Sequence, residues 1–134
     1  MACIAGLLDG TIDFIATDHA PHTAEEKARG LAKAPFGIVG LETAFPLLYT
    51  NLVLPGIISL ERLVELMSAA PRARFGIPEP SPDTYTLWDL DTEYVIDAST
   101  FAGKCKVSPF DGWRIYGRCV KVVYNGKTVY EIDE

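Results

Sequence analysis

The sequence predicts an α/β fold in which one buried strand and a set of helices precede a small antiparallel sheet. Residues 11–17, TIDFIAT, form an apolar, β-branched run, which is typical of a strand covered on both faces. Residues 41–75 place apolar side chains at helical spacing. Residues 84–132 alternate between apolar and polar side chains and contain Asn125-Gly126, a strong signal for a hairpin turn. These later strands are few for their apolar content, so we expect another layer to cover them.

The composition is that of a globular protein. The chain has 134 residues, of which 49% are apolar and 22% charged. A net charge of −6 without a Lys/Arg cluster argues against nucleic-acid binding. No apolar run is long enough for a membrane span, and the N-terminus lacks the basic start of a signal peptide. The three cysteines are odd in number and form no CxxC pair, which favours free thiols and a cytoplasmic location.

The first elements surround a long polar loop. Residues 2–8 predict the end of a helix, which Asp9-Gly10 closes. The strand at 11–17 follows, and then a loop at 18–40 that contains one possible helical turn at 24–30. We expect the charged side chains of that turn to form a solvated face; they are Glu25, Glu26, Lys27 and Arg29.

Two helices and a short turn are predicted next. Residues 41–53 have helical spacing, and Pro46 lies near enough to their start to be tolerated or to kink the helix. Ser59 caps a second helix, and Pro71 and Gly76 bound a last short turn. In the second helix we expect Glu61 and Glu65 to face outward, and Leu60, Leu63, Val64 and Met67 to face the core.

A change of composition marks a plausible domain boundary. Residues 77–83, IPEPSPD, carry three prolines and predict an extended segment. Only strand signals follow, at 84–90, at 92–97 and in a hairpin over 113–132. We therefore divide the chain into residues 1–76 and 77–134.

Three groups able to bind metals or move protons follow the predicted strand. Asp18, His19 and His22 lie at its carboxyl end, where the active sites of α/β barrels are found. Zinc accepts carboxylate and imidazole ligands, and a carboxylate beside metal-bound water can also carry a proton. Pro21 keeps the two histidines off a regular helix. The other interpretation is that Asp18 simply caps a turn, and the pattern alone leaves both open.

Three stretches of the sequence resemble motifs of one known family. IATDHAPH at 15–22 resembles its final barrel-strand motif, and KAPFGIVGLETAFPLLYT at 33–50 resembles its substrate loop and following helix. SPFDGWRIYGRCVKVVYNGKTVYE at 108–131 resembles its C-terminal signature. This family is that of the bacterial dihydroorotases, in the amidohydrolase superfamily. The resemblance implies an incomplete fold that covers the C-terminal third of the family: the last strand-helix part of a (β/α)8 barrel at 1–76, and the antiparallel strands of the small β-sandwich domain at 77–134.

The resemblance also implies a function and roles for four residues. The family catalyses the zinc-dependent, reversible hydrolysis of dihydroorotate to N-carbamoyl-aspartate in pyrimidine biosynthesis. Asp18 matches the metal-binding aspartate that shuttles a proton, and His22 matches a residue that holds the substrate carboxylate. Phe36 and Gly37 match a loop whose backbone contacts the substrate ring, while His19 matches no role beyond shaping the site.

Most of the active site of the family is absent from this chain. The family has a His-x-His motif on its first barrel strand, further metal ligands, and an Arg and an Asn that bind substrate. Here His19 and His22 are the only histidines, and 134 residues are too few for a barrel of about 200 or more. We therefore expect no catalysis by the chain alone, and expect its partner to be the missing N-terminal portion or a second copy.

Two alternatives remain open at this point. The chain would also suit a non-catalytic, dihydroorotase-like scaffold or interaction module, for example for aspartate transcarbamoylase. An independent small metal-binding domain is a weaker alternative, because only Asp18, His19 and His22 are at hand as ligands. The presence of Asp18, His22, Phe36 and Gly37 favours an enzyme fragment over the scaffold.

The predicted strand at 11–17 leads to a first testable prediction. Without neighbouring strands it would expose unpaired backbone and apolar surface, a template for pairing with another chain. We therefore predict that the isolated chain self-associates, or that its first helix-strand segment is rearranged. Light scattering on the purified chain at micromolar concentration measures its size, and a clean monomer would count against this prediction.

Overall fold

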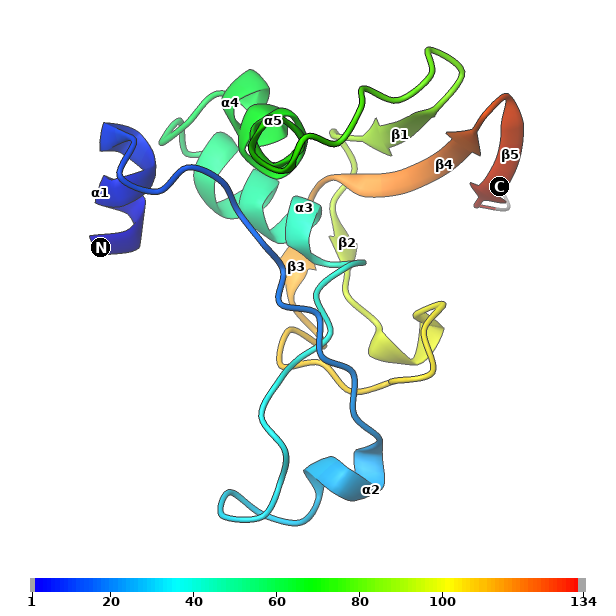
Figure 1. Cartoon of the computed structure of the whole chain (residues 1–134). Coiled ribbons are helices and arrows are strands. Elements are labelled where there is room, and N and C mark those ends of the chain that lie inside the picture. Colours follow the sequence, from blue (N-terminus) through cyan, green and yellow to red (C-terminus); the bar gives the residue numbers. More distant parts are fainter. Residues whose placement is uncertain (1, 133–134) are drawn as a thin grey trace.

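A computed structural model of the chain describes residues 2–132, with helices in the first part and strands in the second (Figure 1). The helices and helical turns are α1 (Ala2–Asp9), α2 (Ala24–Lys27), α3 (Ala44–Leu48), η1 (Tyr49–Val53), α4 (Leu60–Val64), η2 (Glu65–Ala69), α5 (Ala70–Phe75) and η3 (Ala98–Thr100). The strands are β1 (Tyr85–Asp89), β2 (Tyr94–Val95), β3 (Arg114–Ile115), β4 (Arg118–Tyr124) and β5 (Lys127–Glu131). Within residues 2–132, no helix has the length and apolar content needed to cross a membrane.

Local signals start and end these helices as the sequence predicts. The hydroxyl of Ser59 accepts a hydrogen bond from the N–H of Arg62 at 3.2 Å and caps α4. Gly76 takes a left-handed conformation, φ 64°, and ends α5. Pro46 is the third residue of α3, where its missing N–H breaks no helical hydrogen bond.

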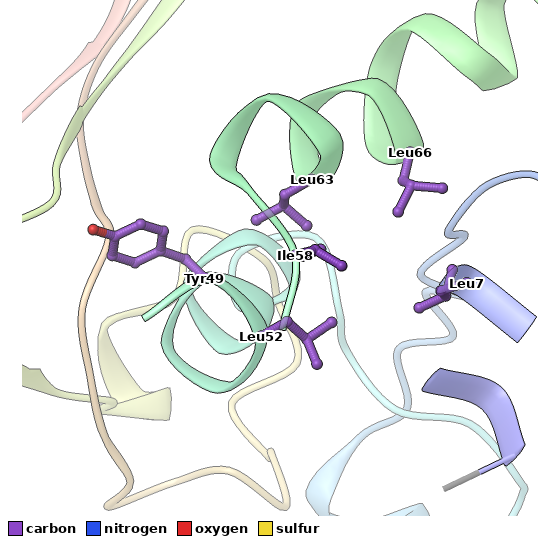
Figure 2. Close-up of a cluster of buried hydrophobic side chains, with 6 residues drawn as sticks. All are labelled: Leu7, Tyr49, Leu52, Ile58, Leu63 and Leu66. Carbon is purple, nitrogen blue, oxygen red and sulfur yellow. The ribbon is translucent and has the colours of Figure 1, made fainter. Parts of the chain in front are cut away.

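A cluster of buried apolar side chains joins α1 to the other helices. Figure 2 shows its members, which are Leu7, Tyr49, Leu52, Ile58, Leu63 and Leu66. Leu63 and Leu66 lie three residues apart on one helix face, and both are fully buried. Val64 was expected in the core, but its side chain lies beside this face and is 49% exposed. That part of the sequence prediction is therefore wrong, because Leu66 occupies the core position instead.

The strand predicted at 11–17 does not form within the described part of the chain. Two isolated backbone hydrogen bonds hold this segment. The N–H of Ile15 donates to the carbonyl of Leu66 at 2.9 Å, and the N–H of Ile12 donates to the carbonyl of Gly6 at 2.8 Å. A parallel strand needs a neighbour with which to exchange a ladder of hydrogen bonds. Residues 2–132 provide only one isolated bridge, between His19 and Ile38.

The second part folds into the predicted antiparallel sheet. β4 lies between β1 and β5, and β2 pairs separately with β3. Asn125 and Gly126 both have positive φ, 48° and 76°, which is the conformation that the turn between β4 and β5 requires. The alternating pattern and the Asn-Gly signal are therefore confirmed for this hairpin.

Several contacts attach the sheet to the helices. The rings of Phe45 on α3 and Trp88 on β1 stack with their centroids 4.0 Å apart. The hydroxyl of Thr50 accepts a hydrogen bond from the N–H of Tyr116 at 2.8 Å. The boundary after residue 76 stays a prediction, as do the domain ranges 1–76 and 77–134, whose first residue and last two residues lie outside the described range.

Truncating a core leucine tests the helical core. We expect Leu63→Ala to lower the free energy of unfolding by about 2–5 kcal/mol, because it leaves a cavity among the buried side chains of Figure 2. Val64→Ala is the matched control and should change stability by no more than about 0.5 kcal/mol, since its side chain is half exposed. Urea unfolding followed by circular dichroism measures both, and equal losses would contradict the assigned core.

Candidate functional site

Asp18 lies at the end of the segment 11–17, in a backbone conformation that few side chains adopt. Its φ is 46°, in the left-handed region, which aspartate tolerates better than most residues. The residue is exposed, and within residues 2–132 its carboxylate makes no hydrogen bond or ion pair. The carboxylate is therefore available to a ligand, and it does not cap a turn within the described residues.

His19 connects this end of the segment to residues 40 and 41. Its Nδ1 accepts hydrogen bonds from the N–H of Gly40 at 3.0 Å and of Leu41 at 3.4 Å. Nδ1 is thus occupied by the backbone, and this contact fits the shaping role expected for His19. Neither His19 nor His22 lies in a helix, as Pro21 predicts.

The side chain of His22 meets the predicted substrate loop. Its Nε2 lies 2.9 Å from the carbonyl oxygen of Phe36, so the protonated nitrogen donates to that oxygen. The backbone carbonyl of His22 accepts a hydrogen bond from the thiol of Cys105, at 2.8 Å. The structure therefore brings together two residues that are 14 positions apart and that the sequence assigned to one site.

The two arms of the loop, residues 17–22 and residues 36–40, are in direct backbone contact. The N–H of Ala20 donates to the carbonyl of Ile38 at 2.9 Å. Gly37 has a φ of 117°, and a Cβ placed there would lie 2.4 Å from the Cβ of Ala20. No side chain fits at residue 37 without moving one arm away from the other.

Lys27 holds the same loop from the end of α2. Its ammonium donates to the carbonyl of Pro35 at 2.9 Å and also to the carbonyl of Gly37. The prediction that Lys27 lies on a solvated face is wrong, because its side chain is partly buried against the loop. No pattern in the sequence signals this contact, since it depends on how residues 28–36 turn back.

The segment that carries His22 and Lys27 is ordered by a reciprocal cap. The hydroxyl of Thr23 accepts from the N–H of Glu26, and the carboxylate of Glu26 accepts from the N–H of Thr23 at 2.9 Å. The backbone hydrogen bond from Thr23 is the main reason that the pKa of Glu26 lies below its usual value. This carboxylate also lies 3.8 Å from Nδ1 of His22.

Two cavities border these residues. The smaller, about 270 Å³, is lined by residues that include Ala20, His22, Lys27 and Ile38. The larger, about 700 Å³, lies over the sheet, and of the predicted site residues only His19 borders it. Tyr94 lines this larger cavity, and burial raises its pKa to about 12. Of the other predicted site residues, His22 lines the smaller cavity, whereas Asp18, Phe36 and Gly37 line neither of the two.

The residues present do not complete a zinc site. A catalytic zinc usually takes three ligands from protein side chains. In the described part of the chain, no three His, Cys, Asp or Glu side chains lie close enough together to hold a metal ion. Asp18 offers a carboxylate, but Nδ1 of His19 and Nε2 of His22 are already hydrogen-bonded to backbone.

Curated proteins similar to this chain are dihydroorotases. The chain is 56% identical over 135 residues to the dihydroorotase of Brevibacillus brevis, in an alignment that covers 97% of this chain and 32% of that protein. It is 53% identical to the dihydroorotase of Bacillus cytotoxicus, with the same coverage. The chain thus spans about a third of the length of the curated relatives it matches. No protein-family model matches it.

Solved structures similar to this chain include an L-hydantoinase and an inactive dihydroorotase-like domain. An L-hydantoinase (dihydropyrimidinase) from Arthrobacter aurescens superposes with a TM-score of 0.87 at 37% identity, over 98% of this chain and 32% of that one. The inactive dihydroorotase-like domain of a CAD-like multifunctional protein from Chaetomium thermophilum superposes with a TM-score of 0.70 at 20% identity, over 95% of this chain and 34% of that one. At this identity the similarity shows a shared fold alone. The predicted resemblance to bacterial dihydroorotases and the incomplete amidohydrolase-type fold are therefore confirmed.

Replacing Gly37 tests the close approach of the two arms. We expect Gly37→Ala to lower the free energy of unfolding by at least about 2 kcal/mol, because the new methyl meets Ala20 and the backbone conformation is strained. Gly30→Ala is the control: its φ is also positive, at 79°, but a Cβ there meets nothing within 4 Å. It should cost only about 1 kcal/mol from strain. Equal losses in urea unfolding would contradict the tight contact.

Proposed function

We propose that this chain is the C-terminal part of a dihydroorotase, and that it contributes one side of an active site that hydrolyses dihydroorotate reversibly to N-carbamoyl-aspartate. The hydrogen bond between Nε2 of His22 and the carbonyl of Phe36 carries this proposal. It joins two motifs that resemble separate substrate-binding elements of the family. The 56% identity to a dihydroorotase over 97% of the chain supports the same conclusion.

The proposed roles follow from which groups are free to bind. Within residues 2–132, the backbone N–H groups of Phe36 and Gly37 make no hydrogen bond. They are therefore donors for an oxygen of the substrate ring. We assign His22 to the substrate carboxylate on the family resemblance instead, because its Nε2 is already hydrogen-bonded to the carbonyl of Phe36. Asp18 would carry a proton from the attacking water to the ring nitrogen that leaves when the amide bond breaks.

The rest of the site would come from outside this chain. Zinc would supply a Lewis acid in the complete site, and Asp18 is the one residue here that we assign to it. The partner would be the N-terminal portion of a dihydroorotase as a separate chain, or a second copy. We place the protein in the cytoplasm and in pyrimidine biosynthesis, in keeping with its three free thiols, Cys3, Cys105 and Cys119.

The alternative function is a non-catalytic scaffold, for example one that binds aspartate transcarbamoylase. The similarity to an inactive dihydroorotase-like domain concerns the fold alone and lends this alternative no further support. Within residues 2–132, the carboxylate of Asp18 and the N–H groups of Phe36 and Gly37 have no hydrogen-bond partner, which favours the enzyme fragment because a scaffold needs none of these free groups.

Reconstitution tests the proposed function. We expect the lone chain, purified without added metal, to contain far less than one zinc per chain by mass spectrometry and to be inactive on dihydroorotate. Mixing it with the N-terminal two-thirds of the Brevibacillus brevis dihydroorotase and zinc should restore hydrolysis, because the missing ligands are then present.

Variants show whether this activity depends on the chain. Asp18→Asn should lower the restored rate at least about 100-fold, as expected for loss of a proton-transfer group. Asp91→Asn, at an exposed site among the strands, is the control and should leave the rate unchanged. A complex that forms but shows no activity with the unsubstituted chain would reject the enzyme fragment in favour of the scaffold.

A further inference from the structure

We propose that Lys27 is a positioning residue, which clamps the loop at residues 35–37 so that the N–H groups of Phe36 and Gly37 face a ligand. The identity of that ligand rests on the proposed function, whereas the clamp rests on geometry alone. None of the sequence patterns assigns Lys27 to the site.

Two side chains hold three consecutive carbonyl groups. The ammonium of Lys27 takes those of Pro35, at 2.9 Å, and of Gly37, and Nε2 of His22 takes that of Phe36 between them, at 2.9 Å. Both side chains come from the short segment that the Thr23–Glu26 cap orders. The short segment at residues 22–27 therefore holds all three carbonyl groups of residues 35–37.

Because the peptide bond is planar, a carbonyl that is held in place also fixes the direction of the N–H group in the same peptide. In a trans peptide the C=O and the N–H of the next residue point in opposite directions. Holding the carbonyl of Pro35 thus turns the N–H of Phe36 away from Lys27, and holding that of Phe36 turns the N–H of Gly37 away from His22. This explains why both N–H groups have no acceptor within the described residues.

The charge of Lys27 suits this task better than a neutral donor would. Within residues 2–132 its ammonium has no carboxylate partner, so carbonyl oxygens provide its hydrogen bonds. Hydrogen bonds from a charged donor are stronger than those from a neutral one. A positive charge at the oxygen end of a peptide also strengthens its N–H as a donor, which favours an anionic or carbonyl oxygen as the ligand.

Amide hydrogen exchange on the 134-residue chain tests the clamp. Two amides remote from Lys27 report on the loop: the N–H of Ala20, which is bonded to Ile38, and the N–H of Gly40, which is bonded to His19. We expect Lys27→Met to speed exchange at both by roughly tenfold or more, because charged hydrogen bonds are lost. Exchange at Ile96, which is bonded to Trp113, should not change if the fold is intact.

Two further variants show whether the effect comes from the charged donors of Lys27 or from any change of a lysine on the loop. Lys27→Arg keeps charged donors, so the exchange rates of Ala20 and Gly40 should stay within about twofold of those in the unsubstituted chain. Lys33→Met, at an exposed lysine on the same loop, should have no effect. Unchanged exchange at Ala20 and Gly40 in Lys27→Met would overturn the clamp, and so would a Lys27→Arg variant that exchanges as fast as Lys27→Met.

Enzyme kinetics of this chain reconstituted with the N-terminal part of a dihydroorotase test whether the ligand of the loop is dihydroorotate. With dihydroorotate we expect Lys27→Met to raise KM about tenfold and to change kcat less, because the N–H donors are misaligned while Asp18 is untouched. Lys27→Arg should restore KM. If the unsubstituted pair is inactive, the proposed function fails, and the exchange measurement still decides whether Lys27 clamps the loop.

Discussion

The close approach of residues 17–22 to residues 36–40 is the constraint on which the rest of the site depends. Ala20 and Ile38 are joined by a backbone hydrogen bond, and Gly37 is close enough to Ala20 that a Cβ would not fit. Because backbone meets backbone here, the side chains that flank the contact have fixed directions. His22 is carried to the carbonyl of Phe36, and His19 to the N–H of Gly40.

Both halves of the chain hold this constraint in place. The helices anchor one arm through the hydrogen bond from Ile15 to Leu66, and α3 begins only four residues after Gly40. From the second half, the thiol of Cys105 donates to the carbonyl of His22, and the carboxylate of Glu42 accepts from the N–H of Ala102 at 2.9 Å. The second half of the chain thus contacts the site through the loop that contains Ala102 and Cys105, and not through its strands.

The site and the fold are incomplete in the same way. The segment 11–17 has strand composition but no strand neighbours in residues 2–132, and no group of three candidate metal ligands forms around Asp18 in those residues. Apolar side chains on the loop are also exposed, Leu31 at 97% and Phe36 at 93%. The chain matches about a third of the length of its curated relatives.

Features that arise within a few residues could be predicted from local sequence patterns. The cap at Ser59, the end of α5 at Gly76 and the turn at Asn125-Gly126 each depend on one side chain and its nearest backbone, so local patterns predict them. The motif around Asp18 and His22 was likewise visible as a candidate site.

Three outcomes follow from tertiary contacts instead. His22 and Lys27 hold the loop at residues 35–37, Leu66 occupies the core position expected for Val64, and residues 11–17 form no strand. These outcomes depend on the path of a long loop and on which neighbours are present, and no spacing pattern encodes either of them.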